Sequence, residues 1–122
     1  MIISKKDLVI IKSFETEYID RRYKPQWNTL RFSKTGYEHQ RMVFDICWWL
    51  YKNGIPFATE TVFTSGYNPD IICPTHVKPI IEVRYSEKDK NTMEKFSRIP
   101  NNLHKNIIFV DANKPFDEKD IL

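Results

Sequence analysis

The sequence predicts a single α/β domain in which helices flank a central mixed sheet of four strands. Three observations indicate this class. Apolar residues recur at helical spacing in two segments before Pro56. After Pro56 the chain changes to short β-branched and aromatic runs bounded by Gly, Pro and Asn. The length of 122 residues is enough for one hydrophobic core and too small for two, so we expect one functional site at most.

The first element is a predicted helix over residues 5 to 22. Ser4 followed by Asp7 is typical of an N-cap with an acid in the first helical turn. The apolar positions that then repeat at helical spacing are Leu8, Ile11, Phe14 and Tyr18. The β-branched run Val9-Ile10-Ile11 leaves a strand as the alternative for the first half. Residues 23 to 35 show no clear period, and we expect a basic connecting loop there.

A second helix is predicted over residues 36 to 52, where Asn53-Gly54 supplies the stop signal. Its main apolar stripe comprises Met42, Val43, Ile46, Cys47 and Leu50. Phe44, Trp48 and Tyr51 form a second apolar flank, so we expect the sheet and another helix to cover this helix on more than one side. Trp48 and Trp49 are accordingly expected to pack in the core.

Four strands are predicted from the runs at 57 to 63, 70 to 73, 79 to 85 and 106 to 110. The first three are joined by short turns, which favours an antiparallel meander. Residues 88 to 98 carry apolar side chains at helical spacing and end before Pro100, which predicts a crossover helix. The last strand should therefore pair in parallel with its neighbour.

The composition indicates a globular protein that works inside the cell. No apolar run is long enough for a membrane span, and the N-terminus lacks the apolar core of a signal peptide. We expect Cys47 and Cys73 to be buried free thiols in an intracellular, cytoplasmic setting. The net charge of +3 is only mildly basic, but residues 21 to 41 hold six basic residues against the single acid Glu38.

Two carboxylates are expected to meet at one point of the sheet. Glu82 and Arg84 project from the same face of an apolar strand, because strand side chains alternate between faces. Asp70 opens the preceding strand and can sit beside Glu82 if the two strands pair. Converging carboxylates suit Mg²⁺ or Mn²⁺, an ion that polarises a phosphate and activates water. Glu38, in the first turn of the second helix, could reach the same ion through water.

These residues resemble the pattern of the PD-(D/E)XK nuclease superfamily. Its members carry, in order, a helical Glu, a strand-opening Pro-Asp and Glu-x-Lys, and the counterparts here are Glu38, Pro69-Asp70 and Glu82-Val83-Arg84. The strand from residue 80 to 86 is similar to that of small archaeal and viral Holliday junction resolvases. The resemblance implies a restriction-endonuclease-like core over residues 36 to 111, with an added N-terminal helix and basic loop over 1 to 35 and a tail over 112 to 122.

The same resemblance implies a homodimeric, metal-dependent DNA endonuclease, with branched or junction DNA as a candidate substrate. Asp70, Glu82 and the backbone carbonyl of Val83 would hold the Mg²⁺ or Mn²⁺ ion. The catalytic set would be Glu38, Asp70, Glu82 and Arg84. The DNA backbone would be contacted by Arg31, Lys34, Arg41, Lys88 and Lys90.

Arg84 stands where the superfamily has lysine. A guanidinium matches phosphate oxygens well, but it does not lose its proton in a protein and so cannot act as a base. Three alternatives follow: the metal alone activates the water, a lysine such as Lys88 or Lys90 substitutes, or the domain binds DNA or a protein without cutting. An RNA nuclease would use the same chemistry.

Simpler interpretations exist for several of these residues. Glu82 and Arg84 could form a surface ion pair, and Glu60, in the strand before Asp70, could be either a supporting acid or an exposed strand residue. The three histidines lack metal-site spacing and are expected to be solvated. Trp27, with Tyr23 and Tyr37 nearby, is a better candidate for contact with nucleic acid than Trp48.

Overall fold

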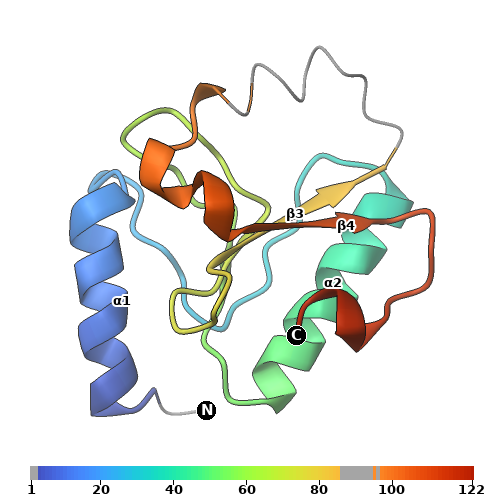
Figure 1. Cartoon of the computed structure of the whole chain (residues 1–122), viewed down its shortest axis with the longest axis horizontal. Helices are drawn as coiled ribbons and strands as arrows, with labels where there is room; N and C mark the ends of the chain where they lie inside the picture. Colours follow the sequence, from blue (N-terminus) through green and yellow to red (C-terminus); the bar gives the residue numbers. More distant parts are fainter. Residues whose placement is uncertain (1–2, 86–94, 96) are drawn as a thin grey trace.

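The computed structural model describes residues 3–85, 95 and 97–122 and forms an α/β domain (Figure 1). Helix α1 (Lys5–Tyr18) and helix α2 (Tyr37–Lys52) precede a four-stranded sheet. The strands are β1 (Ala58–Thr59), β2 (Ile71–Ile72), β3 (Ile80–Arg84) and β4 (Ile107–Asp111), and two 3-10 helices are η1 (Asn101–Asn106) and η2 (Glu118–Asp120). The restriction-endonuclease-like core remains a prediction.

The sheet has the predicted mixed topology. Its spatial order is β1-β2-β3-β4, with antiparallel pairing between the first three strands and parallel pairing of β3 with β4. Strands β1 and β2 are shorter than the runs 57–63 and 70–73 predicted. Glu60 adopts a positive φ of 55°, which ends β1. Pro69 and Pro74 lie on either side of β2, and neither has a backbone N–H to donate to the sheet.

Helix α1 begins as the sequence predicts and ends earlier. The Ser4 side chain accepts a hydrogen bond from the backbone N–H of Asp7 at 3.1 Å, which caps the helix. The β-branched run at 9–11 is helical rather than a strand. The predicted end at residue 22 is wrong, because Ile19 is extended and bridges to Phe63 beside the sheet.

Helix α2 buries its main stripe as expected, but the expected cover on its second flank is wrong. Phe44, Trp48 and Tyr51 are 50%, 51% and 40% exposed, and Trp48 stacks on Tyr51 in contact with solvent. The helix lies in an outer layer and faces the sheet with one stripe only (Figure 1). Trp49 does reach the core, and its indole N–H donates to Glu118 at 2.9 Å.

The core lies on both faces of the sheet. On one face α2 packs against Ile81, Val83 and Val110, and on the other α1 packs with Ile72 and Ile80. Cys47 and Cys73 are free and buried, as predicted. Residues 112–122 fold back onto the α2 side, where Ile121 is fully buried.

Part of the predicted crossover helix at 88–98 lies outside the described residues, while Lys95 and Ser97 are helical. In the part of the chain that the structure describes, no helix is long and apolar enough to cross a membrane.

Candidate active site

Asp70 and Glu82 are held side by side by two reciprocal hydrogen bonds. The backbone N–H of Val83 donates to Asp70 Oδ2 at 2.8 Å, and the backbone N–H of Asp70 donates to Glu82 Oε1 at 3.0 Å. Both bonds arise because Asp70 directly precedes β2 and β2 pairs with β3 through Ile71 and Ile81. The Asp70 carboxylate thus continues the ladder beyond the last paired residue of β2. The pairing of neighbouring strands brings these two acids together as the sequence predicts.

Glu82 is a buried carboxylate with three distinct donors. Only 4% of the residue is exposed. Besides the Asp70 N–H, the Tyr67 hydroxyl donates to Oε1 at 3.0 Å and Lys95 Nζ lies 2.5 Å from Oε2. Burial raises the pKa of the Glu82 carboxyl, the nearby Asp70 charge raises it further, and Lys95 offsets these effects only in part. Glu82 is therefore costly to ionise where it stands.

Tyr67 is committed to holding this carboxylate. Its side chain is fully buried, and burial followed by the negative charge of Glu82 raises the pKa of its hydroxyl. The phenol therefore stays protonated and donates its hydrogen bond to Glu82. No local sequence pattern indicates this contact, since Tyr67 lies in an irregular segment fifteen positions before Glu82.

Lys95 is the cation of the site. It enters from the segment between β3 and β4, and its side chain is 32% exposed while the Glu82 side chain is 6% exposed. Lys88 and Lys90, the sequence-based candidates for the lysine of the superfamily pattern, lie outside the described residues. The lysine in contact with the acids comes from the same inter-strand segment, five positions beyond Lys90.

His39 joins the site from α2, in place of Glu38. Its Nε2 lies 3.3 Å from Asp70 Oδ2, its Nδ1 is 2.8 Å from Thr35 Oγ1, and its side chain is 12% exposed. The expectation of a solvated His39 is wrong. Burial lowers the pKa of His39, but the hydrogen bond and charge of Asp70 outweigh it, and the net shift is upward. Glu38, one residue and about 100° earlier on the helix, pairs with Arg41 at 3.2 Å.

The other histidines bond to the backbone. His76 Nε2 lies 2.6 Å from the carbonyl oxygen of Ile121, and His104 Nε2 lies 2.8 Å from that of Ile99. Neither contacts a carboxylate in these bonds. Each of these bonds links a histidine to the main chain and does not involve the acid cluster.

Glu60 is a third acid in the electrostatic field of the site. It follows β1 directly, and its residue is exposed. Burial of its carboxyl group and the Asp70 charge raise the pKa of Glu60, while Arg31, His39 and Lys95 lower it. Glu60 is therefore an exposed acid just after β1, and its role as a supporting acid for a metal stays a prediction.

Arg84 shares the sheet face of Glu82 but points to a different neighbour. Its guanidinium carbon lies 3.9 Å from the ring centroid of Phe109, the residue paired with Glu82 on β4. Among the described residues no ion pair joins Arg84 to Glu82, so the surface-pair interpretation fails. Val83 lies between them, fully buried, with its N–H turned to Asp70.

The donor set can be tested against the ion that the resemblance implies. Within the described ranges there is no group of three or more His, Cys, Asp or Glu side chains arranged to hold a metal. Asp70 and Glu82 alone suit Mg²⁺, which commonly uses one or two carboxylates and keeps several waters. Burial first, and then the negative charge of the neighbouring Asp70, raise the pKa of Glu82. A divalent cation would relieve this repulsion, so the two residues fit the group.

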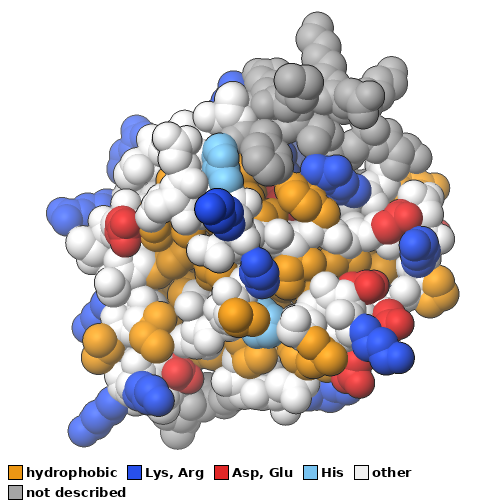
Figure 2. All heavy atoms as spheres, in the orientation of Figure 1, with side chains coloured by type: hydrophobic (Ala, Val, Ile, Leu, Met, Phe, Trp, Pro, Cys, Tyr) orange, Lys and Arg blue, Asp and Glu red, His pale blue; other side chains and the backbone are white. Residues whose placement is uncertain are grey.

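The predicted nucleic-acid contacts separate into two kinds. Arg31 and Lys34 are exposed, and Arg31 acts electrostatically on Glu60. Arg41 is committed elsewhere, since it donates to the carbonyl oxygen of Ala112 at 2.9 Å and pairs with Glu38 and Asp45. On the face in Figure 2, basic and acidic side chains are interspersed with hydrophobic ones. Charge alone therefore marks no interface on that face.

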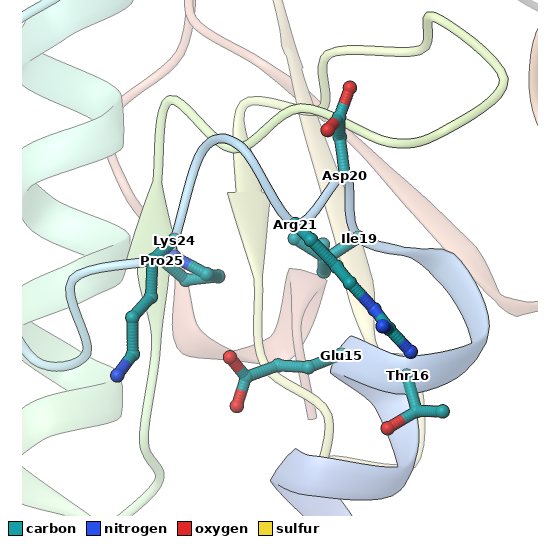
Figure 3. A pocket seen from close by; sticks show the side chains of 7 residues that line it. All are labelled: Glu15, Thr16, Ile19, Asp20, Arg21, Lys24 and Pro25. Atoms are coloured by element: carbon teal, nitrogen blue, oxygen red, sulfur yellow. The ribbon is translucent and has the colours of Figure 1, made fainter.

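Three surface cavities lie apart from the acids. One of about 210 Å³ lies between the end of α1 and the chain that follows it, where Glu15, Arg21 and Lys24 are among the lining side chains (Figure 3). A second, of about 380 Å³, is lined by the exposed flank of α2, and a third, of about 650 Å³, by the C-terminal segment. Neither Asp70 nor Glu82 lines any of them.

Comparisons of the chain with protein-family models, with curated proteins and with solved structures found no match. The geometry of the acid cluster is therefore the basis for inferring a function.

Proposed function

We propose that this protein is a metal-dependent nuclease that hydrolyses phosphodiester bonds of DNA. The observation that carries the proposal is the cluster of Asp70, Glu82 and Lys95, in which two acids and one ammonium group converge where β2 begins beside β3. Acids and a lysine in such a cluster match the needs of phosphodiester hydrolysis, which requires a metal site and a positive charge near the phosphate.

Each residue has a distinct role in this proposal. Asp70 and Glu82, with the backbone carbonyl of Val83, would hold Mg²⁺ or Mn²⁺, which when bound polarises the phosphate and lowers the pKa of water. Lys95 would stabilise the negative charge that develops on the phosphate. His39 would orient Asp70 through their 3.3 Å contact. Lys95 takes the role that the superfamily pattern gives to a lysine at the position of Arg84. His39 takes the place of Glu38 as the residue of α2 that contacts Asp70.

A non-catalytic nucleic-acid-binding module is the second candidate. It is favoured by the Lys95 ammonium group 2.5 Å from Glu82, which already neutralises one of the two acids without a metal. In that case the cluster would be a structural remnant and the basic loop would carry the function. Homodimerisation, as implied by the resemblance, belongs to either candidate.

Cleavage assays separate the two candidates. Purified protein is incubated with linear, supercoiled and branched DNA, and with RNA, in Mg²⁺, in Mn²⁺ or in EDTA. The nuclease proposal expects cleavage with metal only, reduced at least about 100-fold by Asp70→Asn, Glu82→Gln or Lys95→Met. Asp111→Asn, which changes an acid at the end of β4 outside the cluster, is the matched control and should cleave like the wild type.

Two results would overturn the nuclease proposal. One is the absence of metal-dependent cleavage on every substrate by folded protein. The other is cleavage by Asp70→Asn and Glu82→Gln at the wild-type rate, which would point to a contaminating nuclease. Retention of DNA at low salt together with the first result would support the binding module.

A further inference from the structure

We propose that the surface beside the acid cluster binds nucleic acid with unpaired bases, which stack on Phe32 and Tyr37. This inference rests on the proposed function and names its substrate class. Both aromatic residues belong to the segment between α1 and the first turn of α2, and both are turned to solvent. Phe32 is 79% exposed and Tyr37 is 69% exposed.

The chain on each side of Phe32 is fixed to the site. The backbone N–H of Arg31 donates to Thr59 Oγ1 at 3.0 Å, and Thr59 directly precedes Glu60. The backbone N–H of Ser33 donates to Gln40 Oε1 at 3.2 Å, and Gln40 directly follows His39 on α2. The ring of Phe32 is therefore presented to solvent by an anchored backbone rather than by a free loop.

Tyr37 lies in the first turn of α2, the same turn that carries His39. It is the first residue of α2, two positions before His39. The imidazole of His39 spans from Thr35 Oγ1, at 2.8 Å, to Asp70 Oδ2, at 3.3 Å. Tyr37 also lies one turn before Gln40, the residue that holds Ser33, so the two exposed rings share the Gln40 side of the first turn of α2.

The positive charge beside Phe32 suits the binding of a polyanion. Arg31 and Lys34 are exposed and flank Phe32, and Arg31 is close enough to lower the pKa of Glu60. Proteins that hold single strands combine cationic groups along the backbone with aromatic rings on which bases stack. Paired bases inside a duplex do not offer their faces to such rings. The combination therefore favours single-stranded, flapped or splayed nucleic acid over an uninterrupted duplex.

The exposed flank of α2 carries a weaker case for the same role. Phe44 and Trp48 are about half exposed, but they line a cavity of about 380 Å³ whose lining includes no Lys or Arg. That surface lacks the cations that a phosphate backbone requires. Tyr51, in the last turn of α2, therefore offers a matched control for an exposed aromatic residue outside the proposed surface.

Binding measured without metal tests the inference separately from catalysis. Fluorescence anisotropy in EDTA compares labelled single-stranded DNA and RNA of about 16 nucleotides with the matching duplexes. Phe32→Ala and Tyr37→Ala should each weaken single-strand binding about 5- to 100-fold, from the usual contribution of one base stacked on one ring. Duplex binding should change less than about twofold, because phosphate contacts remain.

The control lies on the same helix. Tyr51 is fourteen residues beyond Tyr37, about 21 Å along the axis of α2, and Tyr51→Ala should leave single-strand binding unchanged. Phe32→Trp keeps a ring and should retain binding, which separates stacking from a folding defect. The inference is overturned if both alanine variants bind single strands as the wild type does, if they lose single-strand and duplex binding equally, or if the wild type binds no single strand.

The outcome is distinguishable from failure of the nuclease proposal. Selective loss of single-strand binding supports the stacking surface even if no substrate is cleaved, in which case the non-catalytic candidate stands. Metal-dependent cleavage without any effect of Phe32→Ala or Tyr37→Ala on single-strand binding supports the nuclease and sinks the stacking surface. The relative affinity for DNA and RNA then identifies the source of the unpaired bases.

Discussion

Replacing Asp70 by alanine or by asparagine should have different effects on stability. Either change removes the charge that the proposed metal site needs. The N–H of Val83, a fully buried residue, donates to Asp70 Oδ2 at 2.8 Å. Alanine leaves that N–H without an acceptor, which costs about 1 to 3 kcal/mol, whereas the asparagine amide oxygen can accept the bond in a neutral form. Asparagine also relieves the repulsion between Asp70 and Glu82.

The expected difference in the free energy of unfolding between the two variants comes mainly from the lost acceptor for the Val83 N–H. We expect Asp70→Ala to be about 1 to 2 kcal/mol less stable than Asp70→Asn, since both remove the negative charge beside His39 and only asparagine keeps an oxygen to accept from Val83. At the usual denaturant dependence this is about half to one molar in the urea midpoint. Urea unfolding followed by tryptophan fluorescence measures the midpoint and its slope.

A surface carboxylate provides the control. Asp111 Oδ1 also accepts a backbone N–H, that of Asn113 at 2.8 Å, but Asp111 is exposed and water can replace the bond. Asp111→Ala and Asp111→Asn should therefore unfold at nearly the same urea concentration. Equal midpoints for Asp70→Ala and Asp70→Asn, with unchanged slopes, would refute the assigned bond between Val83 and Asp70.

Three further results are expected. Glu82→Gln should gain stability over the wild type as pH rises above about 4.5, because the raised pKa of Glu82 means that its charged form disfavours the folded state; a constant difference across pH would contradict this. His39→Asn should lose stability mainly below pH 6.5, since a raised histidine pKa stabilises below the unfolded value and the effect disappears as pH rises through the folded one; urea unfolding at pH 5.5 and pH 8.5 measures it. Arg41→Ala should cost about 1 to 2 kcal/mol by removing the bond to the Ala112 carbonyl and should change DNA affinity less than Lys34→Ala does, which denaturation and salt-dependent binding together would check.

Elements defined by backbone periodicity could be predicted from the sequence. Alternation along β3 places Glu82 on the face of Ile80, while Ile81 and Val83 pack against α2 on the other face. The meander and the final parallel strand followed from the lengths of the connections. Predicting the contact between Asp70 and Glu82 required only the pairing of β2 with β3, because both residues lie where these two strands meet.

Contacts that depend on helix phase or on irregular chain could not be predicted in the same way. Glu38 and His39 are adjacent in sequence, and a shift of one residue rotates a helix by about 100°. The sequence did contain a signal for His39. Counting back along the buried stripe from Leu50 through Ile46 and Val43, in steps of four, three and four residues, leads to His39 rather than to Glu38. Lys95 offered no such signal. Its contact depends on the path of a long connection between β3 and β4.

The cost of ionising Glu82 is the strongest physical reason to regard the cluster as functional. A purely structural residue at this position would need to accept hydrogen bonds from Tyr67 and Asp70, and a neutral glutamine side chain could do so. Ion pairs that are buried in this way often stabilise a protein less than neutral residues of similar size. A buried acid with a raised cost of ionisation, a second acid beside it, one lysine and one oriented histidine together exceed what packing requires. Such a concentration of charged groups between two inner strands is typical of sites shaped for chemistry or for binding a cation.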